Sequence, residues 1–350
     1  MGFNMSLIIA IVIALGLDYW LGEPKRLHPL VGFGAFADGL EKWLNCEDGL
    51  LRFARKDDTQ NPSSQGATPH PDHSSLRGEK RRGNFLQLKG ALALILAIGP
   101  LSFAAYSLEQ TLAGSPVLAT LFAAVVLYLA IGWRSLIEHA KAISIPLSQG
   151  DLSAARIAVS RIVSRDTQDL NEQEIAKAAT ESVLENGADA LFAALFWFIV
   201  AGIPGVVIYR LSNTLDAMWG YKNSRFLHFG WAAARFDDLL NFIPARLTAL
   251  AYTLCGSVNG QTQNEWQSWR QQAGTWKSPN AGPVMAAGAG AIGVELGGSA
   301  HYHGQNQDRP TLGSGSAPMA ASIDDACNLV NNSLVLWLEV ICLLAFMGIV

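Results

Sequence analysis

Residues Asn213 to Arg246 concentrate ionisable and amide side chains between two apolar segments of the chain. Carboxylates in such a block could hold Mg²⁺, and guanidinium groups could bind phosphate or carboxylate oxygens. Ionisable groups next to apolar, membrane-like sequence are costly and usually have partners or a function. The alternative is a solvated loop followed by an amphipathic helix. The charged residues of this block are Asp216, Asp237, Asp238, Lys222, Arg225, Arg235 and Arg246.

A second acidic set precedes this block. Asn171 followed by Glu174 predicts a capping box that begins a helix. On that helix Glu181, Glu185 and Asp189 recur every four residues, where like charges repel. Either this face is solvated, or the row is neutralised by Arg165, by Arg210 or by a bound Mg²⁺.

Several common catalytic patterns are absent from the sequence. It contains no Gly-Lys dipeptide and therefore no P-loop, and neither HExxH nor GxSxG occurs. Its four cysteines are far apart with no CxxC, which argues against a zinc site or a disulfide framework. If ATP binds, its phosphates are held by a motif other than a P-loop.

The motifs of the chain, in order, resemble the CbiB/CobD family of cobalamin-biosynthesis membrane proteins, the adenosylcobinamide-phosphate synthases. Two departures are Glu23, where Asp is commoner, and residues 57–80, which look like an insertion. The resemblance rests on Ser164–Thr167, Glu181-Ser182, Glu185-Asn186, Tyr209-Arg210, Asn213–Asp216, Gly220-Tyr221, Gly230-Trp231, Ala234-Arg235, Asp237-Asp238, Pro244–Thr248 and Ser278–Gly282, with weaker matches at Gly22–Pro24, His28-Pro29 and Arg81–Gly83.

The resemblance implies an ATP-dependent amide ligation. A propionate carboxyl of adenosylcobyric acid would join the amine of aminopropanol or of its phosphate, which gives adenosylcobinamide or its phosphate. Such chemistry needs Mg²⁺ on the nucleotide phosphates and cations near the developing charge. Candidate catalytic residues are Asp166, Glu181, Glu185, Asp216, Asp237 and Asp238, of which Asp216, Asp237 and Asp238 are the candidate metal ligands.

Substrate contacts are expected from basic, amide and aromatic side chains. The general base stays open among Glu181, Glu185 and Asp216. Asn280 could bind substrate or cap the helix that follows it, and Tyr221 could line the corrin or simply lie at a membrane interface. The candidate substrate-binding residues are Arg165, Arg210, Asn213, Tyr221, Arg235, Arg246 and Asn280.

The composition indicates that a membrane positions these residues. Of 350 residues, 50% are hydrophobic and only 15% are charged, which is too apolar for an ordinary soluble domain. The net charge of −4 implies no general attraction to nucleic acid. We therefore expect an all-α, polytopic membrane protein with a cytoplasmic helical layer.

Three apolar segments predict the membrane topology near the N-terminus. The first, Leu7 to Leu21, is read as an uncleaved helix rather than a signal peptide. Gly90 to Tyr106 and Val117 to Trp133 are spanning candidates, and the turn between them contains no Lys or Arg. The basic flanks therefore belong in the cytoplasm and the N-terminus outside.

Later apolar segments are irregular. Leu191 to Tyr209 is interrupted around Gly202 to Gly205, so we predict a re-entrant hairpin that returns both motif blocks to the cytoplasmic side. A helix from Trp231 is expected to stop before Pro244. Gly293 and Gly297 form a GxxxG pattern that fits tight helix packing. Ser333 to Val350 is expected to be the last span.

The sequence thus predicts one domain over residues 1–350, with residues 57–83 as a disordered cytoplasmic insertion. The expected protein is an inner-membrane, multi-pass ligase with ATP and Mg²⁺ as cofactors and a cytoplasmic active face. Its partners would be the corrinoid and amine substrates, the lipid bilayer and other corrinoid enzymes. A silent membrane sensor of the AmpE type, a transporter and a scaffold for corrinoid enzymes are the alternatives.

Overall fold

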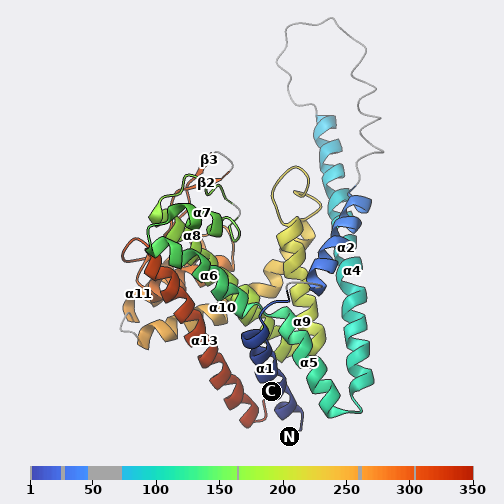
Figure 1. Ribbon diagram of the computed structural model, residues 1–350. Helices are drawn as coiled ribbons and strands as arrows, with labels where there is room; N and C mark the ends of the chain where they lie inside the picture. Colours follow the sequence, from blue (N-terminus) through green and yellow to red (C-terminus); the bar gives the residue numbers. More distant parts are fainter. Residues whose placement is uncertain are drawn as a thin grey trace, which may run out of the picture. The chain divides into compact units, whose positions relative to one another are not determined.

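A computed structural model describes residues 2–24, 28–45, 73–163, 165–258, 262–302 and 305–349 (Figure 1). Helices account for nearly all of its regular structure. The elements of the first half are α1 (Gly2–Leu21), α2 (Pro29–Leu44), α4 (His73–Leu112), α5 (Pro116–Ala130), α6 (Trp133–Ser148), α7 (Leu152–Val159) and α8 (Glu172–Gly187). Those of the second half are a π-helix (Ala188–Phe192), α9 (Ala193–Trp219), α10 (Trp231–Val258), α11 (Thr262–Gln272), a 3₁₀ turn (Ala273–Thr275), α12 (Ala281–Ala291), β1 (Glu295–Gly297), β2 (Ala300–Tyr302), β3 (Gln305–Gln307), β4 (Thr311–Gly313) and α13 (Ala320–Phe346).

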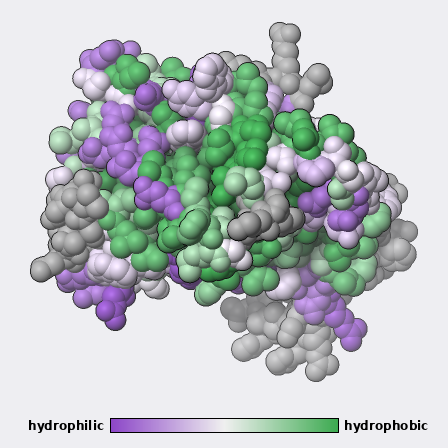
Figure 2. All heavy atoms as spheres, turned by 90° about the horizontal axis from the view of Figure 1, so that it is seen from below, coloured by the Kyte–Doolittle hydropathy of each residue, from purple (hydrophilic) through white to green (hydrophobic). Residues whose placement is uncertain are grey.

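Four helical segments are long and apolar enough to cross a membrane: Arg81–Leu112, Pro116–Ser148, Glu172–Trp219 and Ala320–Phe346. Their spanning windows are at most half buried inside the protein, so much of their apolar surface faces outward. Figure 2 shows broad hydrophobic areas on the face that it presents. The expectation of an all-α polytopic membrane protein is confirmed, and α13 begins thirteen residues before the predicted last span at Ser333.

The chain divides into two compact units. Unit 1 contains residues 1–26, 105–209 and 238–350, and unit 2 contains residues 27–104 and 210–237. In unit 1, helices α6, α7, α8 and α13 pack against one another, and α1 packs on α5 (Figure 1). In unit 2, Gly90 of α4 lies so close to the carbonyl of Phe229 that a Cβ there would clash with it.

The chain reverses direction inside α9, as the break in the apolar segment predicts. Ala201 and Gly202 leave helical geometry, and Gly202 has φ of 61°. Tyr209 Oη donates to the carbonyl oxygen of Asp189 at 2.8 Å. Twenty residues of straight helix would span about 30 Å, so this bond requires a hairpin. Glycine is suited to the turn because a positive φ has no steric cost for it.

The expectation that the helix from Trp231 stops before Pro244 is wrong, because α10 continues to Val258. A proline inside a helix leaves the carbonyl four residues earlier without its N–H donor. That carbonyl belongs to Leu240, and the Trp197 indole nitrogen donates to it at 3.0 Å. A side chain from α9 thus replaces the missing backbone bond, which lets the helix pass through Pro244.

The capping box at the start of α8 is confirmed. Asn171 Oδ1 accepts from the backbone N–H of Glu174 at 3.0 Å, and Glu174 Oε2 accepts from the N–H of Asn171 at 2.9 Å. The two bonds satisfy amides that the first helical turn otherwise leaves unpaired. They fix where α8 begins, and so fix which of its residues face the interior of unit 1.

The segment after α12 forms a small strand region that the sequence did not predict. β1 pairs antiparallel with β4, and β2 with β3. Gly293 and Gly297 lie outside α12 with φ of 67° and 76°, so their reading as a helix-packing GxxxG is wrong. Residues 57–72 of the predicted insertion lie outside the described residues, and its last residues, from His73, belong to α4.

Candidate functional site

Glu181 of α8 lies at the centre of a buried ion cluster in unit 1. Its carboxylate accepts from Arg165 Nη2 at 3.3 Å, from Arg309 Nη1 and Nη2 at 3.1 and 3.0 Å, and from the N–H of Gly297 at 2.9 Å. The exposed fractions of the side chains are 8% for Glu181, 6% for Arg165 and 11% for Arg309. A carboxylate has about four acceptor sites, and all four are taken. Glu181 therefore fixes Arg165, Arg309 and the Gly297 backbone in place and has no open acceptor site for a proton.

Arg309 is the member of this cluster that sequence reasoning missed. It follows β3 and lies 128 residues from Glu181 in a stretch rich in Gly, Gln and Asn. Its Nε also donates to the Gly298 carbonyl at 3.2 Å, and Lys177 Nζ donates to the Gly297 carbonyl at 3.1 Å. Of the proposed neutralising groups for the acidic row on α8, Arg165 does contact Glu181, but Arg309 makes the stronger, two-pronged contact.

Arg246 and Asn280 form a second polar junction in unit 1. Arg246 Nη1 donates to Asn280 Oδ1 at 2.8 Å, its Nη2 donates to the Pro279 carbonyl at 3.0 Å, and its guanidinium lies 3.7 Å from the Phe242 ring centre. Asn280 Nδ2 donates to the carbonyl of Asp238 at 2.8 Å. Burial lowers the pKa of Arg246, and these acceptors compensate the buried charge.

Of the two sequence alternatives for Asn280, helix capping by its side chain is wrong, and substrate binding stays a prediction. Asn280 stands at the N-cap of α12, yet its side chain makes no capping bond. Ser278 Oγ instead accepts from the N–H of Asn280 and of Ala281 at 3.4 and 3.2 Å. The amide of Asn280 is thus committed to Arg246 and Asp238, and it ties the Ser278–Gly282 loop to the acidic end of α10.

In unit 2, three polar side chains of the predicted set meet between α9 and α10. Arg210 Nη1 donates to Asn213 Oδ1 at 3.5 Å, and Asn213 Nδ2 donates to Asp237 Oδ1 at 3.4 Å. Both contacts are long. Arg210 Nε is buried with no hydrogen-bond partner in the part of the chain that the structure describes. A buried guanidinium N–H without an acceptor fits a group that receives an anionic ligand.

Asp216 lies one helical turn beyond Asn213, on the same face of α9. Its carboxylate and carbonyl oxygens lie against Gly220, where a Cβ would clash with both. The Gly220 N–H donates to the Asp216 carbonyl at 2.7 Å, which closes the helix end. Gly220 therefore leaves room for the Asp216 carboxylate, which a larger residue at position 220 would displace.

The loop from Gly220 to Gly230 is anchored to α2 by an ion pair. Arg225 donates to Glu41 from Nη2 at 2.6 Å and from Nε at 3.0 Å, and Asn45 Nδ2 donates to Glu41 Oε1 at 2.7 Å. Glu41 is only 3% exposed. Burial alone would raise the pKa of Glu41, but the bonds from Arg225 and Asn45 outweigh it and lower the pKa.

The remaining predicted residues lie nearer to solvent. Tyr221 is 52% exposed in the loop after α9. Asp166, Glu185 and Arg235 are exposed, and Asp238 is partly buried. The expectation that all thirteen predicted residues line one site stays a prediction, since seven belong to unit 1 and six belong to unit 2.

Oxygen ligands in unit 2 fit Mg²⁺ that is carried mainly by a nucleotide. Among the residues that the structure describes, no three His, Cys, Asp or Glu side chains gather closely enough to hold a metal ion alone. Mg²⁺ is usually bound through one or two carboxylates plus substrate phosphates. A Mg²⁺ ion carried by a nucleotide would need Asp237 and Asp216, which lies one turn beyond Asn213, the partner of Asp237. Arg210 would then be the cation for the phosphates.

Comparison with known proteins decides the family. A family model described as CobD/Cbib protein matches residues 11–330, which is most of the chain. This chain belongs to the CobD/CbiB family. The matched range contains Glu181, Asp216, Asp237 and Asn280, the residues around which the contacts above are built.

Curated relatives of the family carry the name "Cobalamin biosynthesis protein CobD". One from Chromobacterium violaceum is 50% identical over 333 residues, 95% of each chain. One from Stutzerimonas stutzeri is 51% identical over 337 residues, 96% of this chain and 97% of the relative. One from Mycobacterium tuberculosis is 36% identical over 317 residues, 90% of this chain and 88% of the relative. No solved structure matches the chain. Family membership gives this protein a role in cobalamin biosynthesis.

Proposed function

We propose that this CobD/CbiB protein is an ATP-dependent amide ligase. It joins a propionate carboxyl of adenosylcobyric acid to the amine of aminopropanol or its phosphate, and so forms adenosylcobinamide or its phosphate. The observation that carries the proposal is the set of groups in unit 2: the Asn213–Asp237 contact, Asp216 on the same helical face, and the buried Arg210 Nε without an acceptor in the described part of the chain. ATP supplies the phosphoryl group that converts a carboxylate oxygen into a leaving group.

Asp216 and Asp237 are proposed to hold the Mg²⁺ that accompanies ATP. No third carboxylate gathers with them among the described residues, so Asp238 stays an expectation from the sequence alone. Arg210 and Arg235 are proposed to contact phosphate oxygens, because the guanidinium fork matches their geometry. Asn213 orients both Arg210 and Asp237 through its amide. In this arrangement the negatively charged phosphates of the nucleotide would lie against Mg²⁺, Arg210 and Arg235. Fixed cations around the phosphates are the main requirement of phosphoryl transfer.

The unit 1 residues are proposed to bind and position the corrinoid and the amine. Among the described residues Arg165 donates one hydrogen bond, to Glu181, and so retains donors for a substrate carboxylate. Because the four acceptor sites of Glu181 are filled and Asp216 is proposed to hold Mg²⁺, the general base is proposed to be Glu185 or Asp166. Arg246 and Asn280 hold the Ser278–Gly282 loop. Tyr221 of unit 2 is 52% exposed and is proposed separately as an aromatic contact for the corrin.

The active face is proposed to be cytoplasmic in an inner membrane, with the N-terminus outside. The turn between α4 and α5, residues 113–115, has no basic residue. At the other side of this hairpin, Arg81 and Arg82 precede the apolar part of α4, and Arg134 follows α5 at the start of α6. Labelling of Ser153→Cys and Ser224→Cys by an impermeant thiol reagent tests this. Both are expected to react only after the cells are opened, and labelling of either in intact cells would contradict the assignment.

Complementation tests the reaction in the cell. A strain that lacks its own enzyme for this step is fed cobyric acid under cobalamin-dependent growth. Wild type is expected to restore growth, and Asp216→Asn and Asp237→Asn are expected not to. If well-expressed, membrane-inserted wild type fails to restore growth, the protein is a sensor or a scaffold rather than the ligase.

A further inference from the structure

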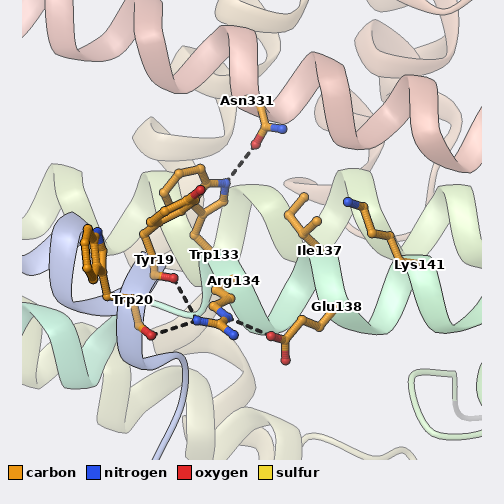
Figure 3. Close-up of a pocket in the computed structure, with 8 residues that line it drawn as sticks. All are labelled: Tyr19, Trp20, Trp133, Arg134, Ile137, Glu138, Lys141 and Asn331. Carbon is orange, nitrogen blue, oxygen red and sulfur yellow. Dashed lines mark hydrogen bonds and ion pairs between the residues drawn. The ribbon is translucent and has the colours of Figure 1, made fainter.

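A cavity of about 650 Å³ opens on unit 1 where the end of α1 meets the start of α6 and the middle of α13. Figure 3 shows the side chains that line it. None of them belongs to the predicted ligase site. The lining residues are Tyr19, Trp20, Trp133, Arg134, Ile137, Glu138, Lys141 and Asn331.

The walls of this cavity are held in place by hydrogen bonds. The Arg134 guanidinium donates from Nη1 to the carbonyls of Tyr19 and Trp20 at 2.8 and 3.0 Å and from Nε to Glu138 Oε1 at 2.6 Å (Figure 3). The backbone N–H of Arg134 donates to Asp18 Oδ2 at 2.8 Å. The cavity is thus formed before any ligand binds, and Arg134 and Glu138 neutralise each other.

Two groups in the cavity retain hydrogen-bond donors. Asn331 Oδ1 accepts from the Trp133 indole at 2.8 Å, and within the described residues both Nδ2 donors of Asn331 remain open. Lys141 makes no ion pair or hydrogen bond within that part of the chain either. Lys141 lies two turns from Arg134 on the same face of α6, and it adds a second positive charge to the cavity. These donors fit a phosphate oxygen.

The cavity lies at the level where apolar helices end. The apolar run of α1 ends at Leu17, before Asp18, and Tyr19 and Trp20 near the end of the helix are 62% and 80% exposed. The spanning helix α5 ends at Ala130, three residues before Trp133, and the Tyr19 and Trp133 ring centres are 6.1 Å apart. Exposed Trp and Tyr at the ends of spanning helices mark the lipid headgroup layer.

We propose that this cavity binds the headgroup of an anionic phospholipid. Its phosphate would accept from Lys141 Nζ and Asn331 Nδ2, and the glycerol backbone would lie against Trp20 and Trp133. Basic pockets between membrane helices are suited to lipid headgroups because the phosphate adds to the general attraction of the anionic surface. The bound lipid would join α1, α6 and α13 and thereby stabilise unit 1.

Thermal unfolding of the full-length protein in mixed micelles tests the proposal. Phosphatidylglycerol is compared with phosphatidylcholine at equal content, and inorganic phosphate is added separately. We expect phosphatidylglycerol alone to raise the unfolding temperature, with an apparent affinity that falls about fivefold in Lys141→Ala. Asn331→Asp keeps the acceptor for Trp133 but replaces the donors, so it should abolish the preference. Arg270→Ala, which removes an exposed cation outside the cavity, should retain it.

Three results would overturn the proposal. The first is equal stabilisation by the two lipids. The second is an equal loss of affinity for phosphatidylglycerol in Arg270→Ala and Lys141→Ala, which would show a general surface attraction. The third is equal stabilisation by inorganic phosphate, which would show a soluble phosphate ligand. Ligase turnover is not part of this readout, so its outcome is separate from that of the proposed reaction.

Discussion

Arg309 holds Glu181 through two parallel hydrogen bonds of 3.1 and 3.0 Å, across 128 residues of chain. Without Arg309, Glu181 keeps Arg165 and the Gly297 N–H but loses two charge-assisted hydrogen bonds, which costs about 3 kcal/mol. Arg309→Met should therefore lower the unfolding temperature of the purified protein markedly and should also reduce activity, because the Glu181 carboxylate that holds Arg165 is no longer fixed.

The double variant Arg309→Met with Glu181→Leu provides the control. Glu181→Leu alone would leave both Arg165 and Arg309 buried without their carboxylate. The double variant removes one of these two charges, so it should unfold at a higher temperature than Glu181→Leu. Additive losses in the double variant would show that the pair does not couple the two residues.

Gly220→Ala should reduce catalysis while leaving the fold intact. The added methyl group would push the Asp216 carboxylate away from its position. A displacement of about 1 Å at a catalytic group can cost about 100-fold in rate. Gly114→Ala is the matched control, because a Cβ added at Gly114 would have no atom within 4 Å of it. Steady-state turnover of both variants would measure the effect, and equal turnover would contradict the role given to Asp216.

The Trp197 indole should matter chiefly because of Pro244. Trp197→Phe leaves the Leu240 carbonyl without a donor, which should cost about 1–3 kcal/mol. In a Pro244→Ala background the new N–H at position 244 can bond to Leu240, so the same Trp197→Phe change should cost less. Thermal unfolding of wild type, the two single variants and the double variant measures the coupling free energy between Trp197 and Pro244. An equal cost of Trp197→Phe in both backgrounds would refute the coupling.

Glu41 should make the Gly220–Gly230 loop sensitive to acid. Because the folded pKa of Glu41 lies below its ordinary value of 4.5, the stabilisation is complete above pH 4.5 and is lost as pH falls through the folded pKa. Proteolysis or hydrogen exchange of the loop should therefore increase below that pH. Glu41→Gln should open the loop at neutral pH and remove this dependence, whereas a loop equally protected in both proteins would disprove the anchor.

Local patterns in the sequence predicted local structure well. The Asn171 capping box, the spans of α4 and α5 and the reversal near Gly202 follow from residue type over a few positions. The polar contacts that define the candidate site cannot be predicted from residue types over a few positions. Arg309 pairs with Glu181 although the two are far apart in the chain. In the same way, Trp197 donates to the Leu240 carbonyl that Pro244 leaves without a backbone donor.

The strand region shows why such contacts escape sequence reasoning. Gly293 and Gly297 match a helix-packing pattern, but both adopt positive φ next to β1. Their conformation places the Gly297 N–H on Glu181 and its carbonyl on Lys177. Only the packing of this turn on α8 distinguishes the two readings. The sequence suggested that Arg165 neutralises the acidic row that contains Glu181, but it did not predict the bonds from Arg309 and Gly297.

Direct assay of amide formation tests the ligase proposal most sharply. Purified full-length protein in lipid nanodiscs receives adenosylcobyric acid, aminopropanol phosphate, ATP and Mg²⁺, and the products are identified by mass spectrometry. Wild type should form one adenosylcobinamide phosphate for each ATP consumed. Asp216→Asn and Asp237→Asn should be about 100-fold slower while remaining folded. Folded wild type that binds the corrinoid but forms no amide would contradict the proposal.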